Sequence, residues 1–254
     1  MRADLLLLEK GLAPSRSAAA RLIERGAVRW RQALQPWQTT RKAGEDLPAG
    51  CELELTDDAE LRWASRAGLK LEGALDALGL SPEGTTALDV GQSTGGFTDV
   101  LLARGAIRVV GVDVGHGQLS PRLRQDPRVA AHEGLNAREL TKASLGADLP
   151  HKGFDLIVGD LSFISQTLVW PALVPLLAPQ GHLLMLVKPQ FELQPQHIGK
   201  GGLVKPDAPV DEIEHRLRTM AQSLSLQVQA WIHSPITGGD GNREHFILMR
   251  HASA

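Results

Sequence analysis

Beyond residue 85, short apolar runs alternate with helical stretches along the chain. Runs of this length and composition are typical of parallel strands, which are buried on both faces. Consecutive parallel strands need a crossover connection, and a helix is the usual one. The alternation therefore predicts an open, doubly wound α/β sheet. The predicted strands are Ala87–Val90, Val109–Val112, Val129–His132, Asp155–Val158, Leu183–Val187, Gln227–Ile232 and His245–Met249, and the predicted helices are Phe97–Arg104, Pro121–Gln125 and Gln166–Leu177.

A glycine-rich turn, Leu88–Phe97 (LDVGQSTGGF), joins the first of these strands to the first helix. Glycines at such a turn allow the backbone to approach a ligand closely. Position 93 is serine, so the dinucleotide fingerprint Gly-x-Gly-x-x-Gly fails, which leaves an adenosyl cofactor without a pyrophosphate. The next strand ends at Asp113, 24 residues beyond Asp89, where a carboxylate can accept both hydroxyls of a ribose. The alternative is a turn whose glycines serve packing alone.

Three charged residues, Asp160, Lys188 and Glu244, stand at the ends of predicted strands. Ligand sites in open α/β sheets lie at the carboxyl ends of the strands, so Asp160 and Lys188 should share an edge with the glycine-rich turn. An alcohol is a poor nucleophile until a base takes its proton, and a lysine serves as that base when burial or a neighbouring cation lowers its pKa. Taken singly, each of the three is equally compatible with a solvated strand end.

The N-terminal part of the chain is strongly basic. Residues 1–42 carry nine basic and three acidic side chains, a local charge of +6 in a chain whose net charge is −2. Such a block indicates a surface for a polyanion, and a solvated basic surface without a partner is the alternative. The pattern predicts a helix capped by Asp4, with Leu5 and Leu8 inward, and a second helix from Ser15 to a stop at Gly26. Short strands are expected near residues 28–30 and 52–55.

This basic part resembles the S-four RNA-binding domain, which is named for a ribosomal protein. The matching segments are Arg2-Ala3-Asp4, Gly11-Leu12, Ser15-Arg16, Arg21-Leu22-Ile23 and Gly26-Ala27-Val28. The hairpin that follows departs from the family, because Trp30-Arg31-Gln32 stands in place of Val-Asn-Gly. The resemblance implies a small α+β module with RNA contacts from Arg2, Ser15, Arg16, Arg21, Arg25 and Arg66.

From Arg2 to nearly its end, the chain is similar to the hemolysin A or TlyA group of ribosomal RNA 2′-O-methyltransferases, which have an FtsJ-like catalytic domain. The further matching segments are Ser65–Leu71, Leu88–Phe97, Glu133–Asn136, Gly159–Ser165, Val187–Glu192, Ser234–Ile236 and Gly241–Glu244. Two positions depart from the family: Gln92 replaces the usual alanine, and His245 interrupts the usual Glu-Phe pair. The resemblance implies a Rossmann-like class I methyltransferase sheet, mostly parallel with its last strand antiparallel.

The same resemblance implies that S-adenosylmethionine methylates the 2′-hydroxyl of a cytidine in ribosomal RNA, with ribosomal subunits as partners. The family's catalytic set falls on Lys70, Asp160, Lys188 and Glu244: Lys188 would be the base, Asp160 would orient it, and the other two would tune charge and place the ribose. Asn136 would help to hold the adenine, although a helix cap explains it equally well. The expected cofactor contacts are Asp89, Gly91, Ser93, Thr94, Gly95, Gly96, Phe97, Asp113, Val114, Asn136 and Asp160.

The implied domains are residues 1–60 (RNA binding), residues 61–84 (a linker or the first catalytic helix) and residues 85–254 (methyltransferase). Residues 194–209 are expected to form a mobile loop over the site. The lone Cys51 cannot form an internal disulfide, and the nine histidines lack a metal-ligand spacing. No apolar stretch reaches the ~20 residues of a membrane span. We therefore expect a cytoplasmic protein without a metal or a membrane partner.

Three other functions remain open at this stage. The segment Asp160-Leu161-Ser162-Phe163 partly resembles the Asp/Asn-Pro-Pro-Tyr loop of base-amine methyltransferases, but it lacks the prolines. A non-catalytic RNA-binding protein and a membrane-active haemolysin are the other two.

Overall fold

The computed structural model describes residues 1–56, 58 and 61–252. Its contacts divide the chain into two compact units, Met1–Arg66 and Ala67–Ala254. The predicted boundary at residue 60 lies outside the described residues. Helix α3 (Ala67–Leu78), within the segment expected to be a linker or the first catalytic helix, belongs to the second unit. The domain limits given in the sequence analysis stay predictions.

In the first unit, two helices share a core with a small antiparallel sheet of order β2-β1-β3. Leu7, Leu22, Ile23 and Val28 are fully buried in that core. The second helix begins where the Ser15 hydroxyl accepts a hydrogen bond from the Ala18 N–H at 3.2 Å, which supplies one of the helix's free N-terminal amides with a partner. The elements are α1 (Ala3–Glu9), α2 (Arg16–Glu24), β1 (Val28–Arg31), β2 (Gln38–Thr39) and β3 (Glu52–Leu55).

The prediction that Asp4 caps the first helix is wrong. Arg2 occupies the N-cap position, and Asp4 is buried in the first turn. Its carboxylate accepts hydrogen bonds from the guanidinium groups of Arg2 at 2.9 Å and Arg16 at 3.2 Å. A buried carboxylate needs such charged partners, and Arg2, foremost, lowers its pKa. Of the two leucines expected to point inward, Leu8 packs against the core, but Leu5 is exposed and Leu6 and Leu7 are buried instead.

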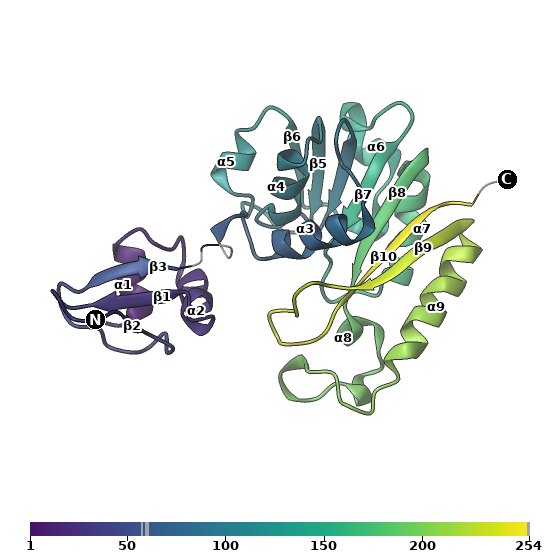
Figure 1. Ribbon diagram of the computed structural model, residues 1–254. Helices are drawn as coiled ribbons and strands as arrows, with labels where there is room; N and C mark the ends of the chain where they lie inside the picture. Colours follow the sequence, from purple (N-terminus) through teal and green to yellow (C-terminus); the bar gives the residue numbers. More distant parts are fainter. Residues whose placement is uncertain (57, 59–60, 253–254) are drawn as a thin grey trace. The chain divides into compact units, whose positions relative to one another are not determined.

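The second unit is built on a sheet of order β6-β5-β4-β7-β8-β10-β9 (Figure 1). Neighbouring strands from β6 to β8 are parallel, whereas β10 is antiparallel to both β8 and β9. This arrangement confirms the predicted fold class, a mostly parallel sheet with an antiparallel last strand. The strands are β4 (Thr86–Val90), β5 (Arg108–Asp113), β6 (Val129–Glu133), β7 (Phe154–Gly159), β8 (Leu177–Val187), β9 (Leu226–His233) and β10 (His245–His251).

Helices cover both faces of this sheet. The largest core cluster packs side chains of α7 (Trp170–Leu173) and α9 (Val210–Ser223) against Met185 and Ile247 of the sheet. Neighbouring strand residues point to opposite faces, so Phe246 lies on the other face, where it stacks on Phe97 of α4 (Gly96–Ala103) at 6.2 Å between ring centroids. The remaining elements are α5 (Pro121–Arg124), η2 (Ala137–Glu139), α6 (Lys142–Leu145), η3 (Gly146–Asp148), α8 (Pro189–Glu192), η6 (Pro195–His197) and η7 (Lys200–Gly202).

The single helix predicted over Gln166–Leu177 is wrong. The segment consists of three short pieces, η4 (Gln166–Leu168), α7 and η5 (Val174–Leu176), and β8 begins at Leu177 instead of Leu183. Pro171 and Pro175 lack the N–H that a continuous helix requires. The side chain of Trp170 anchors the broken segment, since it is fully buried and donates to Gln166 Oε1 at 3.0 Å.

Candidate active site

A pocket of about 390 Å³ lies at the carboxyl ends of β4, β5 and β7. Gly91 follows β4 with a φ of +84°, and a Cβ there would lie 2.7 Å from the carbonyl oxygen of Asp160. Only glycine allows the turns after β4 and β7 to approach this closely. The lining residues are Gly91, Ser93, Val112, Asp113, Val114, Gln118, Leu135, Ala137, Asp160, Leu161, Ser162 and Phe163.

The predicted cofactor residues divide into those that line this pocket and those that do not. Gly91, Ser93, Asp113, Val114 and Asp160 line it. Asp89, Thr94, Gly95, Gly96, Phe97 and Asn136 are not among the lining residues. Asn136 is exposed and caps η2 through its side-chain oxygen, which accepts from the Arg138 N–H at 3.1 Å, as its alternative interpretation requires.

Asp113 ends β5 with its carboxylate at the pocket. One oxygen accepts from the Ser93 N–H at 2.8 Å, and the other accepts from the Gly115 N–H at 2.7 Å. These bonds fix the orientation of the carboxylate and leave each oxygen a further lone pair. Asp113 can therefore still accept hydrogen bonds from two vicinal hydroxyl groups.

Asp89 lies beneath the glycine-rich turn and is 1% exposed. One carboxylate oxygen, Oδ2, accepts from the Thr98 N–H at 3.0 Å and from the Thr98 hydroxyl at 2.7 Å. The other oxygen, Oδ1, is buried without a hydrogen-bond partner among the described residues. Burial raises the pKa of Asp89 to about 7, although the bonds from Thr98 oppose the shift.

The structure accounts for the unusual Gln92. Its side chain is buried and donates from Nε2 to the Thr98 hydroxyl at 2.9 Å, which extends the chain of hydrogen bonds to Asp89. The space comes from Gly111 on β5, where a Cβ would lie 2.0 Å from the Gln92 amide. Gln92 and Gly111 therefore form a size-matched pair.

Lys188 and Asp160 meet at the same edge of the sheet, one after β8 and the other after β7. The Lys188 Nζ lies 2.5 Å from an Asp160 oxygen, and the two side chains are only 11% and 15% exposed. Nζ also donates to the Ser162 hydroxyl at 2.9 Å. The amine is thus held between a carboxylate and a hydroxyl beside the pocket.

Lys70 and Glu244 form a second ion pair, with 2.6 Å between Nζ and the carboxylate and side chains only 8% and 2% exposed. The pair joins α3 to the start of β10, and α3 fits closely because Gly73 leaves room for the Pro235 ring, which a Cβ would approach to 2.7 Å. Burial raises the pKa of Glu244, while Lys70 and, more weakly, Lys188 oppose the shift. The influence of Lys188 and Asp160 on Glu244 shows that the two pairs lie within electrostatic reach of each other.

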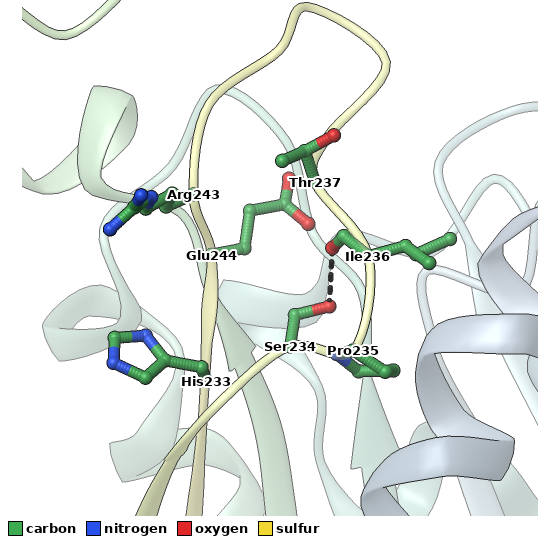
Figure 2. Close-up of a pocket in the computed structure, with 7 residues that line it drawn as sticks. All are labelled: His233, Ser234, Pro235, Ile236, Thr237, Arg243 and Glu244. Carbon is green, nitrogen blue, oxygen red and sulfur yellow. Dashed lines mark hydrogen bonds between the residues drawn. The ribbon is translucent and has the colours of Figure 1, made fainter.

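Glu244 also lines a smaller pocket of about 200 Å³ beside the turn between β9 and β10. Figure 2 shows its carboxylate directed toward Thr237 on the turn, while Arg243 and His233 point to the opposite side of the strand. The turn is stiffened by the Ser234 hydroxyl, which donates to the Ile236 carbonyl at 2.8 Å. The Glu244 carboxylate therefore stands between α3 and this turn.

Two residues of the site, Ser162 and Phe163, were not predicted from the sequence. Ser162 holds Lys188, and Phe163 is 90% exposed with a φ of +63°, a backbone conformation that is strained for an aromatic residue. The Phe163 ring lies 4.9 Å from that of Phe191 and leaves its outer face open at the pocket. Both residues stood in the matched segment Gly159–Ser165, so the signal was available, but only Asp160 was selected from it.

The unusual His245 is buried next to Glu244. Its ring lies 4.9 Å from Trp231 and 4.7 Å from His233, centroid to centroid. Burial, followed by the neighbouring His233, lowers the pKa of His245 to about 4. His245 is therefore an uncharged packing residue at neutral pH.

The first unit presents fewer free cations than its sequence suggests. Glu54 and Glu52 of β3 pair with Arg29 at 2.7 Å and with Arg31 at 2.6 Å. Of the predicted RNA-binding residues, Arg2 and Arg16 share Asp4 and Ser15 caps α2. The charge of +6 counted over residues 1–42 overlooks these partners from β3, so the local excess of positive charge is smaller.

Metal-ligand and membrane-spanning features are absent from residues 1–56, 58 and 61–252. No three His, Cys, Asp or Glu side chains in these ranges are grouped so that they could hold a metal ion. No helix there combines the length and the apolar character needed to cross a bilayer.

Two family models match the chain. One described as FtsJ-like methyltransferase matches residues 63–251, and one described as S4 domain matches residues 1–29. The 16S/23S rRNA (cytidine-2′-O)-methyltransferase TlyA of Mycobacterium tuberculosis is 42% identical over 98% of this chain and 89% of its own length. Hemolysin A of Brachyspira hyodysenteriae is 35% identical over 98% of this chain and 100% of its own length. A solved structure of a hemolysin candidate from Streptococcus thermophilus is similar, with a TM-score of 0.75 and 36% identity over 100% of this chain and 89% of that one.

Proposed function

The chain belongs to the FtsJ-like methyltransferase family, as its sequence predicted, and from this we propose that it transfers a methyl group from S-adenosylmethionine to the 2′-hydroxyl of a cytidine in ribosomal RNA. The observation that carries the proposal is that Asp160 and Ser162, which line the pocket, hold the amine of Lys188, while the buried ion pair Lys70–Glu244 lies within electrostatic reach of them. Four charged groups drawn from distant parts of a chain are rarely buried together unless function requires them.

The pocket fits S-adenosylmethionine in its donor and acceptor groups. Asp113 offers two acceptor oxygens to the ribose hydroxyls, and Val114, Leu135 and Ala137 offer apolar surface to the adenine. The Asp89 carboxyl lies below the turn with its Oδ1 unpartnered among the described residues, and its ionised form favours a cationic ligand. When bound, the cofactor would supply an electrophilic methyl group.

Lys188 would act as the general base. With the methyl donor bound, the uncharged Nζ of Lys188 would accept the proton that the ribose 2′-hydroxyl gives up as its oxygen receives the methyl group. Asp160, 2.5 Å from Nζ, stabilises the ammonium that forms, and Ser162 fixes the direction of the amine. Lys188 therefore serves the chemical step, while Asp160 orients it.

Lys70 and Glu244 would set the charge around the target ribose. Their pair is buried, so it presents a fixed field and needs little reorganisation during the reaction. Phe163 offers an open aromatic face at the mouth of the pocket, on which a base taken out of its stack would rest. The site thus holds both the sugar and the base of one nucleotide.

The first unit would bring the RNA to the enzyme. Arg2, Arg16, Arg21 and Arg25 lie on or beside its two helices, and Arg66 ends the unit. Guanidinium groups of this kind bind phosphates and position the RNA without reading its sequence. Ribosomal subunits are the proposed partners, and the cytoplasm is the proposed compartment.

The test uses purified chain, tritiated S-adenosylmethionine and ribosomal subunits that lack 2′-O-methyl groups. We expect label in ribosomal RNA, recovered as 2′-O-methylcytidine after nuclease digestion, and none with Lys188→Ala. Lys152→Ala, which removes an exposed lysine before β7, is the matched control and should keep full activity. Label on a base amine would favour the base-methylating alternative, and RNA binding without any transfer would favour a non-catalytic protein.

A further inference from the structure

One buried amide joins two segments of the active-site edge that lie 40 residues apart in sequence. Asn242 is 4% exposed and stands two residues before Glu244. Its side-chain oxygen accepts from the Val204 N–H at 2.9 Å, and its side-chain nitrogen donates to the Gly202 carbonyl at 2.9 Å. In Figure 1 the yellow turn between β9 and β10 lies beside the green segment after α8, as these two bonds require.

The segment that Asn242 holds is itself closed. Gly199 N–H donates to the Leu203 carbonyl at 2.7 Å, and Ile198 forms a β-bridge with Val204. Lys205 Nζ donates to the Gln196 carbonyl at 2.7 Å. Residues 197–205 therefore form a defined loop with one attachment point on the turn, although the mobility expected for residues 194–209 stays a prediction.

Asp240 extends the connection to Lys188. One Asp240 oxygen accepts from the Asn242 N–H at 3.1 Å, and the other accepts from Asn242 Nδ2 at 2.9 Å and from Gln190 Nε2 at 3.0 Å. Gln190 stands two residues after Lys188, just as Asn242 stands two residues before Glu244. The hydrogen-bonded series Gln190–Asp240–Asn242, which we call the clasp, thus links the Lys188 end of the site to the Glu244 end.

We infer that Asn242 is a positioning residue, which through the clasp holds the Glu244 carboxylate at a fixed place relative to Lys188. The inference rests on the proposed function and adds a residue that touches neither cofactor nor ribose. The Glu244 backbone is held by the bond from the Ser234 N–H to its carbonyl at 2.9 Å, but the turn that precedes it contains Gly238, Gly239 and Gly241. The clasp removes the freedom that these glycines would otherwise give the turn.

The decisive variant is Asn242→Asp, which keeps the shape and the acceptor for Val204 but replaces the donor to Gly202 and Asp240 by a negatively charged oxygen. We expect kcat for methyl transfer to fall by about 10²-fold, the size of a roughly 1 Å misplacement, while the affinity for S-adenosylmethionine stays within about twofold. Gln196→Ala, which changes an exposed side chain immediately before the same loop, is the matched control and should keep the wild-type kcat.

A second substitution tests the hydrogen bond between Asn242 and Asp240. Asp240→Asn added to Asn242→Asp places a donor opposite the new carboxylate, and Gln190 can meet it by turning its amide, whose Oε1 has no partner among the described residues. We expect the double variant to recover about tenfold of the lost kcat, because the two residues interact directly. If Asn242 and Asp240 acted independently, the losses of kcat in the two single variants would add up in the double variant.

Three results would overturn the inference: an unchanged kcat in Asn242→Asp, an equal loss of cofactor affinity, or no recovery in the double variant. Hydrogen exchange of the Val204 backbone amide tests the inference without enzymatic turnover. In Asn242→Ala the Val204 amide loses its acceptor and should exchange on the order of tenfold faster. Unchanged Val204 exchange would contradict the bond by which Asn242 holds the loop, and with it the inference, whereas absence of methyl transfer by the wild type would contradict only the proposed function.

Discussion

Asp89→Asn tests whether burial controls the charge of the residue beneath the cofactor turn. The pKa of Asp89 rises from an ordinary 3.8 to about 7 because the carboxylate is buried. The unfolded chain therefore loses this proton first as the pH increases. The free energy of unfolding that depends on Asp89 declines as the pH rises from 3.8 through about 7, and asparagine removes the decline.

The magnitude follows from the two pKa values. Their full separation corresponds to about 4 kcal/mol, at roughly 1.4 kcal/mol for each pKa unit. Between pH 5 and pH 8, where the experiment is practical, the part that changes is about 2–3 kcal/mol. The stability of Asp89→Asn relative to wild type should rise by that amount across this range. The comparison between variants cancels other titrating groups, including His245.

The assay is urea unfolding of the cofactor-free chain at pH values from 5 to 8. Tryptophan fluorescence reports the second unit through Trp170 and Trp231 once Trp30, Trp37 and Trp63 of the first unit have been replaced by phenylalanine in all the proteins compared. The same substitution at the exposed Asp155 controls for the general effect of removing a carboxylate. A stability difference between Asp89→Asn and wild type that stays constant within about 0.5 kcal/mol, the usual scatter of such measurements, would refute the burial argument.

Three further predictions concern packing, pH and RNA. Gly111→Ala should lower the free energy of unfolding in urea by about 1–3 kcal/mol, because the new methyl group collides with the Gln92 side chain. Adding Gln92→Ala should restore most of that stability. Equal losses of stability in the single and double variants would exclude the collision. In the wild type, the free energy of unfolding should fall by on the order of 3 kcal/mol as the pH falls from 6.5 to about 4, because in that range only the unfolded state protonates His245. His245→Phe should abolish this loss. Parallel curves of stability against pH for the two proteins would contradict the prediction. Arg16→Ala should weaken RNA binding and reduce the slope of log Kd against log salt by about 1 in filter-binding titrations. Arg31→Ala, at a residue outside the predicted RNA contacts, should change neither. An Arg31 effect as large as that of Arg16 would show that the RNA also contacts the β1–β3 surface.

The sequence alone determined the features that depend on local order. Alternating apolar runs predicted the parallel strands, and the glycine-rich turn predicted where β4 must meet a ligand, because burial and turn formation leave a periodic record along the chain. The placement of Lys188 beside Asp160 also follows, since carboxyl ends of neighbouring parallel strands share one edge. The sequence went wrong at Asp4 and at Gln166–Leu177, where a buried ion pair and two prolines outweighed a capping preference and an apolar pattern.

Only the tertiary structure decided which distant groups meet. Lys70 reaches Glu244 because α3 packs on the face of the sheet to which Glu244 points, and Arg29 and Arg31 are paired because β3 adds to β1 in one register. The open ring of Phe163 and the contacts of Asn242 depend likewise on backbone angles and on loops that approach from elsewhere in the chain. Such pairings arise from packing across the fold, and the periodicity of a single segment carries no record of its future neighbours.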